Sequence, residues 1–561
     1  MQLRMAALVL ATCVAACPTG SASGNSSENQ TNEELPAAGR STTQSTSALT
    51  GTYKLLAWSE LGMHCMDGKD YSVFAVLPPY NSVHAQLVKM GEPPQRITTG
   101  VTITYEATPD ITGSINTISS TKTNLWSYIK ILFLSGNPPD VGLTGNHTQD
   151  LKPRKLSYDS KNAYWTANGI PTVPYDDQGQ RNPYGMAKIV ARDSNGNILA
   201  SAKIVLSVSD EMGCSHCHAS SSGDKDARPA SGWENNPAPL KDTKLNILKK
   251  HDDRWNITAY LPALAKMGYG YQSSLYQTAK DGTPILCATC HGTNALNMKG
   301  ISPIRSMTSD IHTLHGPQIN YDNGVPLNNQ SDPLKSCYLC HPGVTTKCER
   351  GAMNKTKCFD CHGNLARVGD PSRAGWLDEP ACQMCHTNSQ RYPTTFDRPG
   401  HWRVATDLTF ATNKDKPLPG KRLYRYSSGH GSLYCSGCHG SPHAEFPTLQ
   451  ANDNVYSQAL QGHTGKIAEC TVCHTQPPVT ANGGPHKVHT VGQAWVDSHH
   501  DYVEKVGLGE CAYCHGSDFR GSFLSKTSMR RSFDAGDYGT KIYKARDTVT
   551  CYDCHNGPDG G

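Results

Sequence analysis

The pattern Cys-x-x-Cys-His occurs nine times in this chain and constrains its fold more than any other feature. With 22 cysteines and 24 histidines in 561 residues, chance would produce this pattern far less than once. Numbered 1 to 9 in chain order, the motifs are Cys214, Cys217 and His218; Cys287, Cys290 and His291; Cys337, Cys340 and His341; Cys358, Cys361 and His362; Cys382, Cys385 and His386; Cys435, Cys438 and His439; Cys470, Cys473 and His474; Cys511, Cys514 and His515; and Cys551, Cys554 and His555.

The spacing within each motif matches the covalent attachment of haem c. Two thiols three residues apart can each add to one vinyl group of a haem, and the adjacent histidine then reaches the iron from the proximal side. Zinc ribbons and disulfide frameworks also use paired cysteines, but neither needs a histidine after every second cysteine. The sequence therefore predicts nine covalent haems c, each held by two cysteines and one proximal histidine.

The composition fits a core that cofactors complete. Only 37% of the residues are apolar and 7% are aromatic, while there are 51 glycines and 35 prolines, which makes a thin core for this length. Nine porphyrins would supply the missing apolar bulk. Each haem also brings two propionates, so the formal net charge of +4 becomes about −14 in the haem-loaded protein. Nucleic acid is therefore not an expected partner.

The N-terminus has the features of an export signal. Arg4 precedes an apolar run, Met5 to Ala16, that is too short to span a bilayer. Residues 14–17 resemble a bacterial lipobox, so residues 1–17 are the expected signal peptide and Cys17 the expected lipidation site, with ordinary cleavage nearby as the alternative. We expect an exported protein, either a lipoprotein of the outer membrane and cell surface or a periplasmic protein. Its only membrane attachment would be the lipid.

Two segments without haem motifs follow the signal. Residues 18–50 are polar and almost free of apolar side chains, which predicts a flexible linker. Residues 51–210 alternate apolar and polar residues as strands do, and Asn195-Gly196 is a typical hairpin turn. We expect an all-β, sandwich-like domain there. The expected strands lie at residues 72–77, 101–106, 186–191 and 198–208.

Residues 211–561 carry all nine motifs, so each haem must touch a neighbour. The first cysteines of motifs 3, 4 and 5 are only 21 and 24 residues apart, and we expect these three haems to lie closest together. Helical patterning is weak outside Lys241–Lys250 and Trp495–Lys505. The sequence predicts a multihaem cytochrome c region, rich in loops, with short helices packed around nine haems.

The second axial ligand decides what each haem can do. A histidine or methionine there favours electron transfer, whereas an open position favours substrate chemistry. His216 lies between the cysteines of motif 1 and is expected to face solvent, while His64 and His84 are either structural or contact a haem at the domain interface. Ten histidines of the haem region are candidate distal ligands: His251, His312, His315, His401, His430, His443, His463, His486, His489 and His499.

Several short segments resemble the large multihaem c-type cytochromes of metal-reducing bacteria. The resemblance implies an outer-surface or periplasmic electron carrier whose haems chiefly have two histidine ligands. It also implies redox proteins as electron donor and acceptor, and an extracellular mineral or metal such as a metal oxide as an external acceptor. The segments that carry it are residues 61–67, 77–81, 428–443, 462–463, 484–489, 491–496 and 519–521.

Four cysteines lie outside the motifs. Cys13 would be lost with the signal peptide, and Cys17 is the expected lipidation site. The remaining two, Cys65 and Cys348, form an even pair in an oxidising compartment. They either form a disulfide that joins the β domain to the haem region, or stay as two buried thiols, because spacing alone does not fix connectivity.

Two classes of function remain. An electron carrier would have every iron bound by two protein ligands, whereas a multihaem oxidoreductase of nitrogen or sulfur oxyanions would keep one open haem. All nine motifs end in histidine and further histidines are plentiful, so the sequence favours the carrier over the enzyme. Self-assembly into a filament is an alternative to a lipid-anchored monomer, because the last motif lies six residues from the C-terminus.

Overall fold

The structure is a computed structural model. It describes residues 52–320, 323–354, 356–372, 424–476, 489, 491–516, 518–521, 525–527 and 529–558, all of which belong to one compact unit. The predicted signal peptide with Cys17, the linker 18–50, motif 5, His401 and His486 lie outside the described residues. In the described part of the chain, no helix combines the length and apolar character needed to cross a lipid bilayer.

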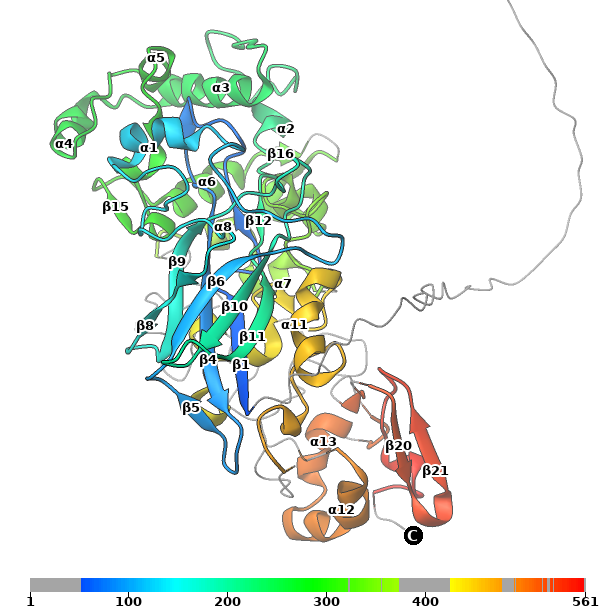
Figure 1. The fold of residues 1–561 in the computed structure, drawn as a ribbon. Helices are drawn as coiled ribbons and strands as arrows, with labels where there is room; N and C mark the ends of the chain where they lie inside the picture. Colours follow the sequence, from blue (N-terminus) through cyan, green and yellow to red (C-terminus); the bar gives the residue numbers. More distant parts are fainter. Residues whose placement is uncertain are drawn as a thin grey trace, which may run out of the picture. The chain divides into compact units, whose positions relative to one another are not determined.

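Two antiparallel sheets form the N-terminal region (Figure 1). The first has the strand order β1–β4–β9–β8, with β5 also paired to β4, and the second has the order β11–β10–β6–β7. The first sheet comprises β1 (Tyr53–Ser59), β4 (Tyr80–Lys89), β5 (Gln95–Ile97), β8 (Ser157–Asp159) and β9 (Tyr164–Pro171). The second comprises β6 (Thr102–Thr108), β7 (Arg154–Lys155), β10 (Met186–Arg192) and β11 (Ile198–Val205).

The strands expected from sequence at residues 101–106, 186–191 and 198–208 are present as β6, β10 and β11. The run at residues 72–77 forms only the two-residue strand β3 (Phe74–Ala75). The predicted hairpin turn joins β10 to β11, where Asp193 N–H donates to the Asn197 carbonyl (3.0 Å). Gly196 takes a φ of +85°, which explains the glycine at this position.

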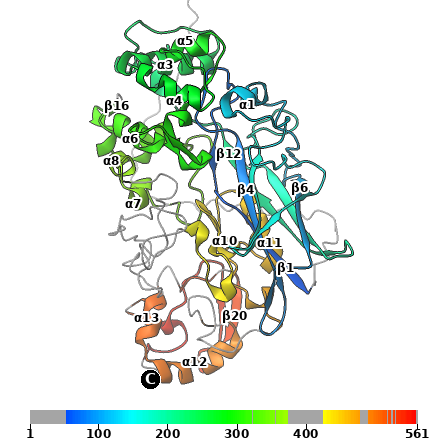
Figure 2. The same cartoon turned by 90° about the vertical axis from the view of Figure 1, so that its left-hand side faces the viewer.

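The two sheets share one buried core, which residues of the haem region complete. Leu55 and Val83 of the first sheet pack with Ile189 of the second. Tyr434, directly before motif 6, stacks on Trp58 with ring centres 5.5 Å apart. Helices α10 (Cys435–His439) and α11 (Ala451–Gln461) lie beside this sandwich, against β1 and β11 respectively (Figure 2). The β region and the haem region are therefore joined through a common apolar interior.

A second buried core lies around α1 (Leu125–Phe133) and α3 (Pro239–Arg254). Two short parallel strand pairs lie nearby: β2 (His64–Cys65) pairs with β12 (Val208–Ser209), both before residue 210, and β3 pairs with β13 (Ile285–Leu286) across that residue. Helix α3 covers the helix expected at Lys241–Lys250. The domain border at residues 210 and 211 stays a prediction.

Short helices and two-stranded ribbons make up the haem region. Helix α12 (Gln493–Val506) contains the helix predicted at Trp495–Lys505. The other helices are α2 (Ser215–His218), α4 (Leu261–Lys266), α5 (Leu275–Lys280), α6 (Met307–His315), α7 (Cys358–His362), α8 (Leu365–Val368) and α13 (Gly509–His515). The ribbons are β14 (His291–Thr293) with β15 (Met298–Gly300), β16 (Ile319–Asn320) with β17 (Val325–Pro326), β18 (Gly440–Ser441) with β19 (Ala444–Glu445), and β20 (Arg531–Asp534) with β21 (Thr540–Tyr543).

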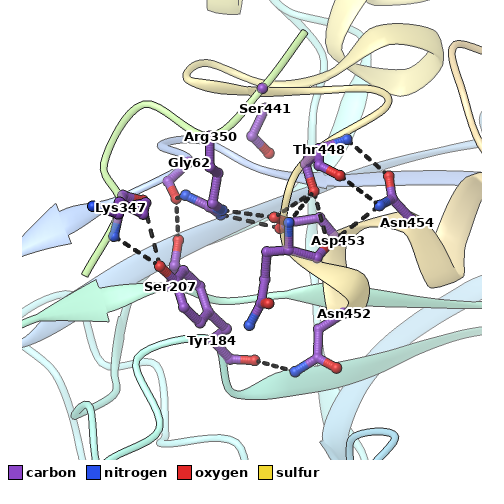
Figure 3. A network of polar contacts seen from close by, with 12 residues as sticks. Gly62, Tyr184, Ser207, Lys347, Arg350, Ser441, Thr448, Asn452, Asp453 and Asn454 are labelled. Atoms are coloured by element: carbon purple, nitrogen blue, oxygen red, sulfur yellow. Dashed lines mark hydrogen bonds and ion pairs between the residues drawn. The ribbon is translucent and has the colours of Figure 1, made fainter. Parts of the chain in front are cut away.

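A buried polar network ties four distant segments together (Figure 3). Arg350, only 1% exposed, forms an ion pair with Asp453 and donates to the Gly62 carbonyl (2.6 Å). Its guanidinium also lies over the ring of Tyr184, 4.9 Å from the ring centre. This arginine fixes the segment between motifs 3 and 4 against the β region.

Candidate haem-binding sites

Eight of the nine motifs lie in the described part of the chain, and each is built on a helical turn. Residues three and four apart on such a turn lie on one side, so the two cysteines and the histidine can serve one group. In motifs 1, 3, 7 and 9 the histidine N–H donates to the carbonyl of the first cysteine over 2.8–3.1 Å. This bond fixes the backbone of the histidine relative to that of the first cysteine.

The structure describes most of the attachment cysteines. In motif 4, Cys361 lies on α7 three residues after Cys358, and both thiols are half-buried. In motif 8, Cys511 and His515 are placed on α13, but the side chain of Cys514 lies outside the described residues. The whole of motif 5 also lies outside them, namely Cys382, Cys385 and His386. Their attachment and ligand roles, and the expected closeness of the haems of motifs 3, 4 and 5, stay predictions.

Seven motif histidines each face a second histidine, with ring centres 6.0–6.5 Å apart. Each of these second histidines is among the ten candidates identified from sequence. The pairs are His218 with His315, His291 with His251, His341 with His312, His362 with His443, His474 with His430, His515 with His489, and His555 with His499.

The separation within these pairs fits a metal ion between the rings. Two imidazoles bound on opposite sides of one metal, at about 2 Å per bond, have ring centres about 6 Å apart. The angles between ring planes range from 14° to 89°, which is compatible with axial ligation because each ring can rotate about its own bond to the metal. The side chains present therefore fit haem iron held by two histidines.

Metal binding requires a neutral imidazole with a free nitrogen, and four of the paired histidines have features that favour this state. Burial lowers the pKa of His218 to about 4, and it lowers the pKa of His341 as well. Nδ1 of His312 donates to the Thr308 carbonyl, and Nδ1 of His315 to the Ile311 carbonyl, both over 2.7 Å. Because a carbonyl only accepts, Nδ1 carries the proton and Nε2 keeps its lone pair for a metal.

Three of the ten distal candidates are not seen opposite a motif histidine in the described ranges. His401 and His486 lie outside the described residues. His463 has both nitrogens engaged, Nδ1 with the Thr464 carbonyl (2.9 Å) and Nε2 with the Glu469 carboxylate (3.1 Å). Motif 6 occupies α10, where the carbonyl of its His439 accepts from the Phe446 N–H (2.6 Å).

The two histidines of the β region pack among aromatic rings. His64 lies 4.1 Å from Tyr80 and His84 lies 4.5 Å from Tyr164, measured between ring centres. Both are buried, and the two alternatives from sequence, a structural role or contact with a haem, stay predictions. His216 is exposed, as its place between the two cysteines of motif 1 predicts.

Cys65 and Cys348 are free thiols in the structure, so the disulfide suggested by their even number is not formed in it. Burial raises the pKa of Cys65, and the nearby charge of Cys348 adds to the effect. Cys348 Sγ lies 3.8 Å from Nδ1 of His443. Burial disfavours charge on His443, but Cys348, Glu349 and Glu445 outweigh it and raise the pKa to about 10. Cys348 thus contacts a candidate haem ligand.

Two carboxylates that contact proximal histidines have no signal in the sequence. Asp310 Oδ2 lies 2.8 Å from Nδ1 of His291, and Glu92 Oε2 lies 3.1 Å from Nδ1 of His474. Glu92 comes from the turn between β4 and β5, 382 residues before its partner. Only the folded chain brings these groups together.

A tryptophan between two distal candidates was also missed from sequence. The ring of Trp495 is stacked on His489 at 4.2 Å and 8°, and its centre lies 6.2 Å from that of His499. His489 faces motif 8 and His499 faces motif 9. Trp495 therefore packs between ligand positions of two successive motifs.

Comparison with known proteins bears on the same region. The family model described as outer membrane cytochrome MtrC/MtrF-like, domains II/IV, matches residues 350–525. This is a family of large multihaem c-type cytochromes of metal-reducing bacteria, located at the outer membrane on the cell surface. The resemblance predicted from the short segments is confirmed for this part of the chain. No curated protein and no solved structure matches the chain.

Proposed function

We propose that this chain, a multihaem cytochrome by its MtrC/MtrF-like segment, carries nine haems c and conducts electrons at the outer membrane toward an external acceptor. The observation that carries the proposal is the set of seven opposed histidine pairs, each of which would fill both axial positions of one iron. When bound, the haems supply one-electron transfer. The protein supplies attachment, axial ligands and close spacing.

Contacts between motifs support passage of electrons from one haem to the next. Gly213 N–H, before motif 1, donates to the Cys340 carbonyl of motif 3 (3.2 Å). Cys337 of motif 3 and Cys358 of motif 4 are also neighbours, because each thiol shifts the pKa of the other. At the C-terminal end, the backbone N–H of Cys551 in motif 9 donates to the Phe519 carbonyl, which follows motif 8 (3.2 Å). Motifs in such contact hold their haems side by side.

The alternative function is an oxidoreductase in which one haem keeps an open position for substrate. In the described pairs, both sides of each expected haem are already occupied by histidine, which supports the carrier. An enzyme would show a high-spin signal in the paramagnetic resonance spectrum of the oxidised protein. A carrier would show only low-spin haem.

The first experiment is to purify the protein from cells with intact cytochrome maturation machinery. The mass should exceed that of the mature polypeptide by nine haems, and the oxidised spectrum should be that of six-coordinate, low-spin iron. A colourless protein, or a mass equal to the bare polypeptide, would overturn the proposal. A high-spin signal amounting to one haem would instead favour the oxidoreductase.

The second experiment tests the external acceptor and the lipid anchor. The reduced protein should be reoxidised when mixed with a ferric oxide suspension, with loss of its reduced absorption bands. Cells that make Cys17→Ala should release the protein from the membrane fraction, because a lipid on Cys17 is its proposed anchor. Retention of the variant in the outer membrane would show that another attachment exists.

A further inference from the structure

Helix α6 lies beside the histidines of three motifs. His312 faces His341 of motif 3, and His315 faces His218 of motif 1, with ring centres 6.1 and 6.3 Å apart. The third contact is made by Asp310, whose Oδ2 lies 2.8 Å from Nδ1 of the proximal histidine of motif 2. One nine-residue helix therefore meets motifs 1, 2 and 3.

The positions on the helix explain how one short element does this. An α-helix turns about 100° per residue, so His312 and His315 are neighbours on one face while Asp310 lies nearly opposite His312. Ser309 Oγ and Thr313 Oγ1 both donate to the Gly369 carbonyl, over 2.7 and 3.0 Å, and hold the helix against the end of α8. The helix is thus fixed in orientation.

The partner of His291 differs in kind from those of several other paired histidines. His312, His315 and His499 donate from Nδ1 to backbone carbonyls, which are neutral. Nδ1 of His291 also contacts a carbonyl, that of Arg305 (3.2 Å), but its nearer partner at 2.8 Å is the carboxylate of Asp310, which is only 16% exposed. A hydrogen bond from Nδ1–H to a negative oxygen makes an imidazole a stronger electron donor through Nε2.

Arg305 controls the strength of this bond. Its Nε donates to Oδ1 of Asp310 over 2.7 Å, while Oδ2 of the same carboxylate faces His291. The arginine holds the carboxylate in place and withdraws part of its negative charge. Asp310 and Arg305 therefore act in opposite directions on the donor strength of the imidazole.

We propose that Asp310 is a positioning residue that lowers the reduction potential of the motif 2 haem below those of motifs 1 and 3. A stronger donor ligand stabilises ferric over ferrous iron, so this haem would hold an electron least readily of the three around α6. Electrons that reach α6 would then reside on the haems of motifs 1 and 3. This inference rests on the proposed function.

The test compares Asp310→Asn with Arg305→Gln in the haem-loaded full chain. The potentiometric titration is fitted to nine one-electron components. Asp310→Asn should raise one of the nine reduction potentials by about 59 mV, which corresponds to about a tenfold change in the equilibrium constant of reduction. Arg305→Gln should lower the same component. The g-values of one low-spin haem should change in the Asp310→Asn protein, because the hydrogen bond to its ligand His291 has changed. Asp332→Asn, which removes a carboxylate that caps a short turn, is the matched control.

Unchanged potentials in Asp310→Asn, or shifts of the same sign in both variants, would overturn the inference. Equal shifts of all nine components would overturn it too, because they would indicate a general effect of charge. The mass and the low-spin spectrum of each variant are measured independently of its reduction potentials, and they test the proposed function. Nine haems and low-spin iron with unmoved potentials would leave the proposed function standing while this inference fails.

Discussion

Arg350 donates two hydrogen bonds to the carboxylate of Asp453, over 2.6 and 3.0 Å, across 103 residues of sequence. Both side chains are buried, so the pair has no water to replace a lost partner. Breaking a buried pair costs more than its formation gains, because one charge is left without compensation. The contact therefore has a predictable effect on stability.

Replacing Arg350 by methionine should lower the free energy of unfolding by about 3–5 kcal/mol, because Asp453 stays buried without its cation. Urea unfolding followed by tryptophan fluorescence measures the effect. Arg154→Met, which breaks a partly exposed pair with Asp150, should cost at most about 1 kcal/mol. Equal losses in the two variants would contradict the assigned difference in burial.

Removing a distal histidine should create one high-spin haem. His315→Ala leaves motif 1, and His312→Ala leaves motif 3, with a single histidine. Each variant should show high-spin iron for one of the haems by paramagnetic resonance, and added imidazole should restore the low-spin signal. His216→Ala is the control and should leave the spectrum unchanged. A fully low-spin His315→Ala protein would disprove this pairing.

Replacing Trp495 by leucine should alter the spectrum of one haem without changing the number of haems. The tryptophan is stacked on His489 and limits rotation of that imidazole. We expect altered g-values for one low-spin component. Trp255→Leu, which removes a half-exposed tryptophan, should have no such effect. Identical spectra for the two variants would show that the stacking does not orient the ligand.

Asp242 should contribute to stability at neutral pH and lose that contribution in acid. Burial raises its pKa, but hydrogen bonds from the Ser220 hydroxyl and from the backbone N–H groups of Ser220 and Asn236 outweigh this and lower it. A carboxyl whose pKa is lower folded than unfolded stabilises the fold above its unfolded pKa of about 4, and the effect is lost as pH falls through the folded pKa.

Asp242→Asn should therefore cost about 1–3 kcal/mol at pH 7 and little at a pH of about 2. Urea unfolding at a series of pH values measures the difference between variant and parent. Asp193→Asn is the comparison, because Asp193 lies in the exposed β10–β11 turn. A constant loss for Asp242→Asn across the whole pH range would show that packing, and not ionisation, is responsible.

Cys65 and Cys348 should both react with an alkylating reagent when the protein is denatured without reductant. Each would add one label in the peptide mass spectrum, because the structure holds both as thiols. In the native protein Cys65 should react slowly, since burial raises its pKa and the thiolate is the nucleophile. Labels that appear only after reduction would establish the disulfide instead.

The types of residue that could bind haem were predictable from the sequence. Which of them lie opposite each other in the fold was not. The seven paired distal histidines were all among the sequence candidates, because nearly every histidine of the haem region outside the nine proximal positions was a candidate. Which histidine faces which motif depends on the fold: His312 and His315 are three residues apart and face different motifs. His463 was also a candidate from sequence, but in the structure its Nε2 contacts the carboxylate of Glu469.

The strands were predictable for a similar reason. The β10–β11 hairpin is encoded by alternating residues and a local turn, so the sequence predicted it. The contact of Tyr434 with Trp58 has no local signal, since the two rings are far apart in the chain. The same holds for Glu92 and His474, whose hydrogen bond forms only after the β4–β5 turn reaches motif 7.

The stacking of Tyr434 on Trp58 bears on biogenesis. The N-terminal segment predicts export, and an exported chain emerges N-terminus first, so that strand β1 would leave the translocation channel long before Tyr434. Until then one side of Trp58 has no native neighbour, and apolar surface left open during synthesis invites aggregation. The open side of Trp58 would therefore be covered only when the segment around Tyr434 arrives.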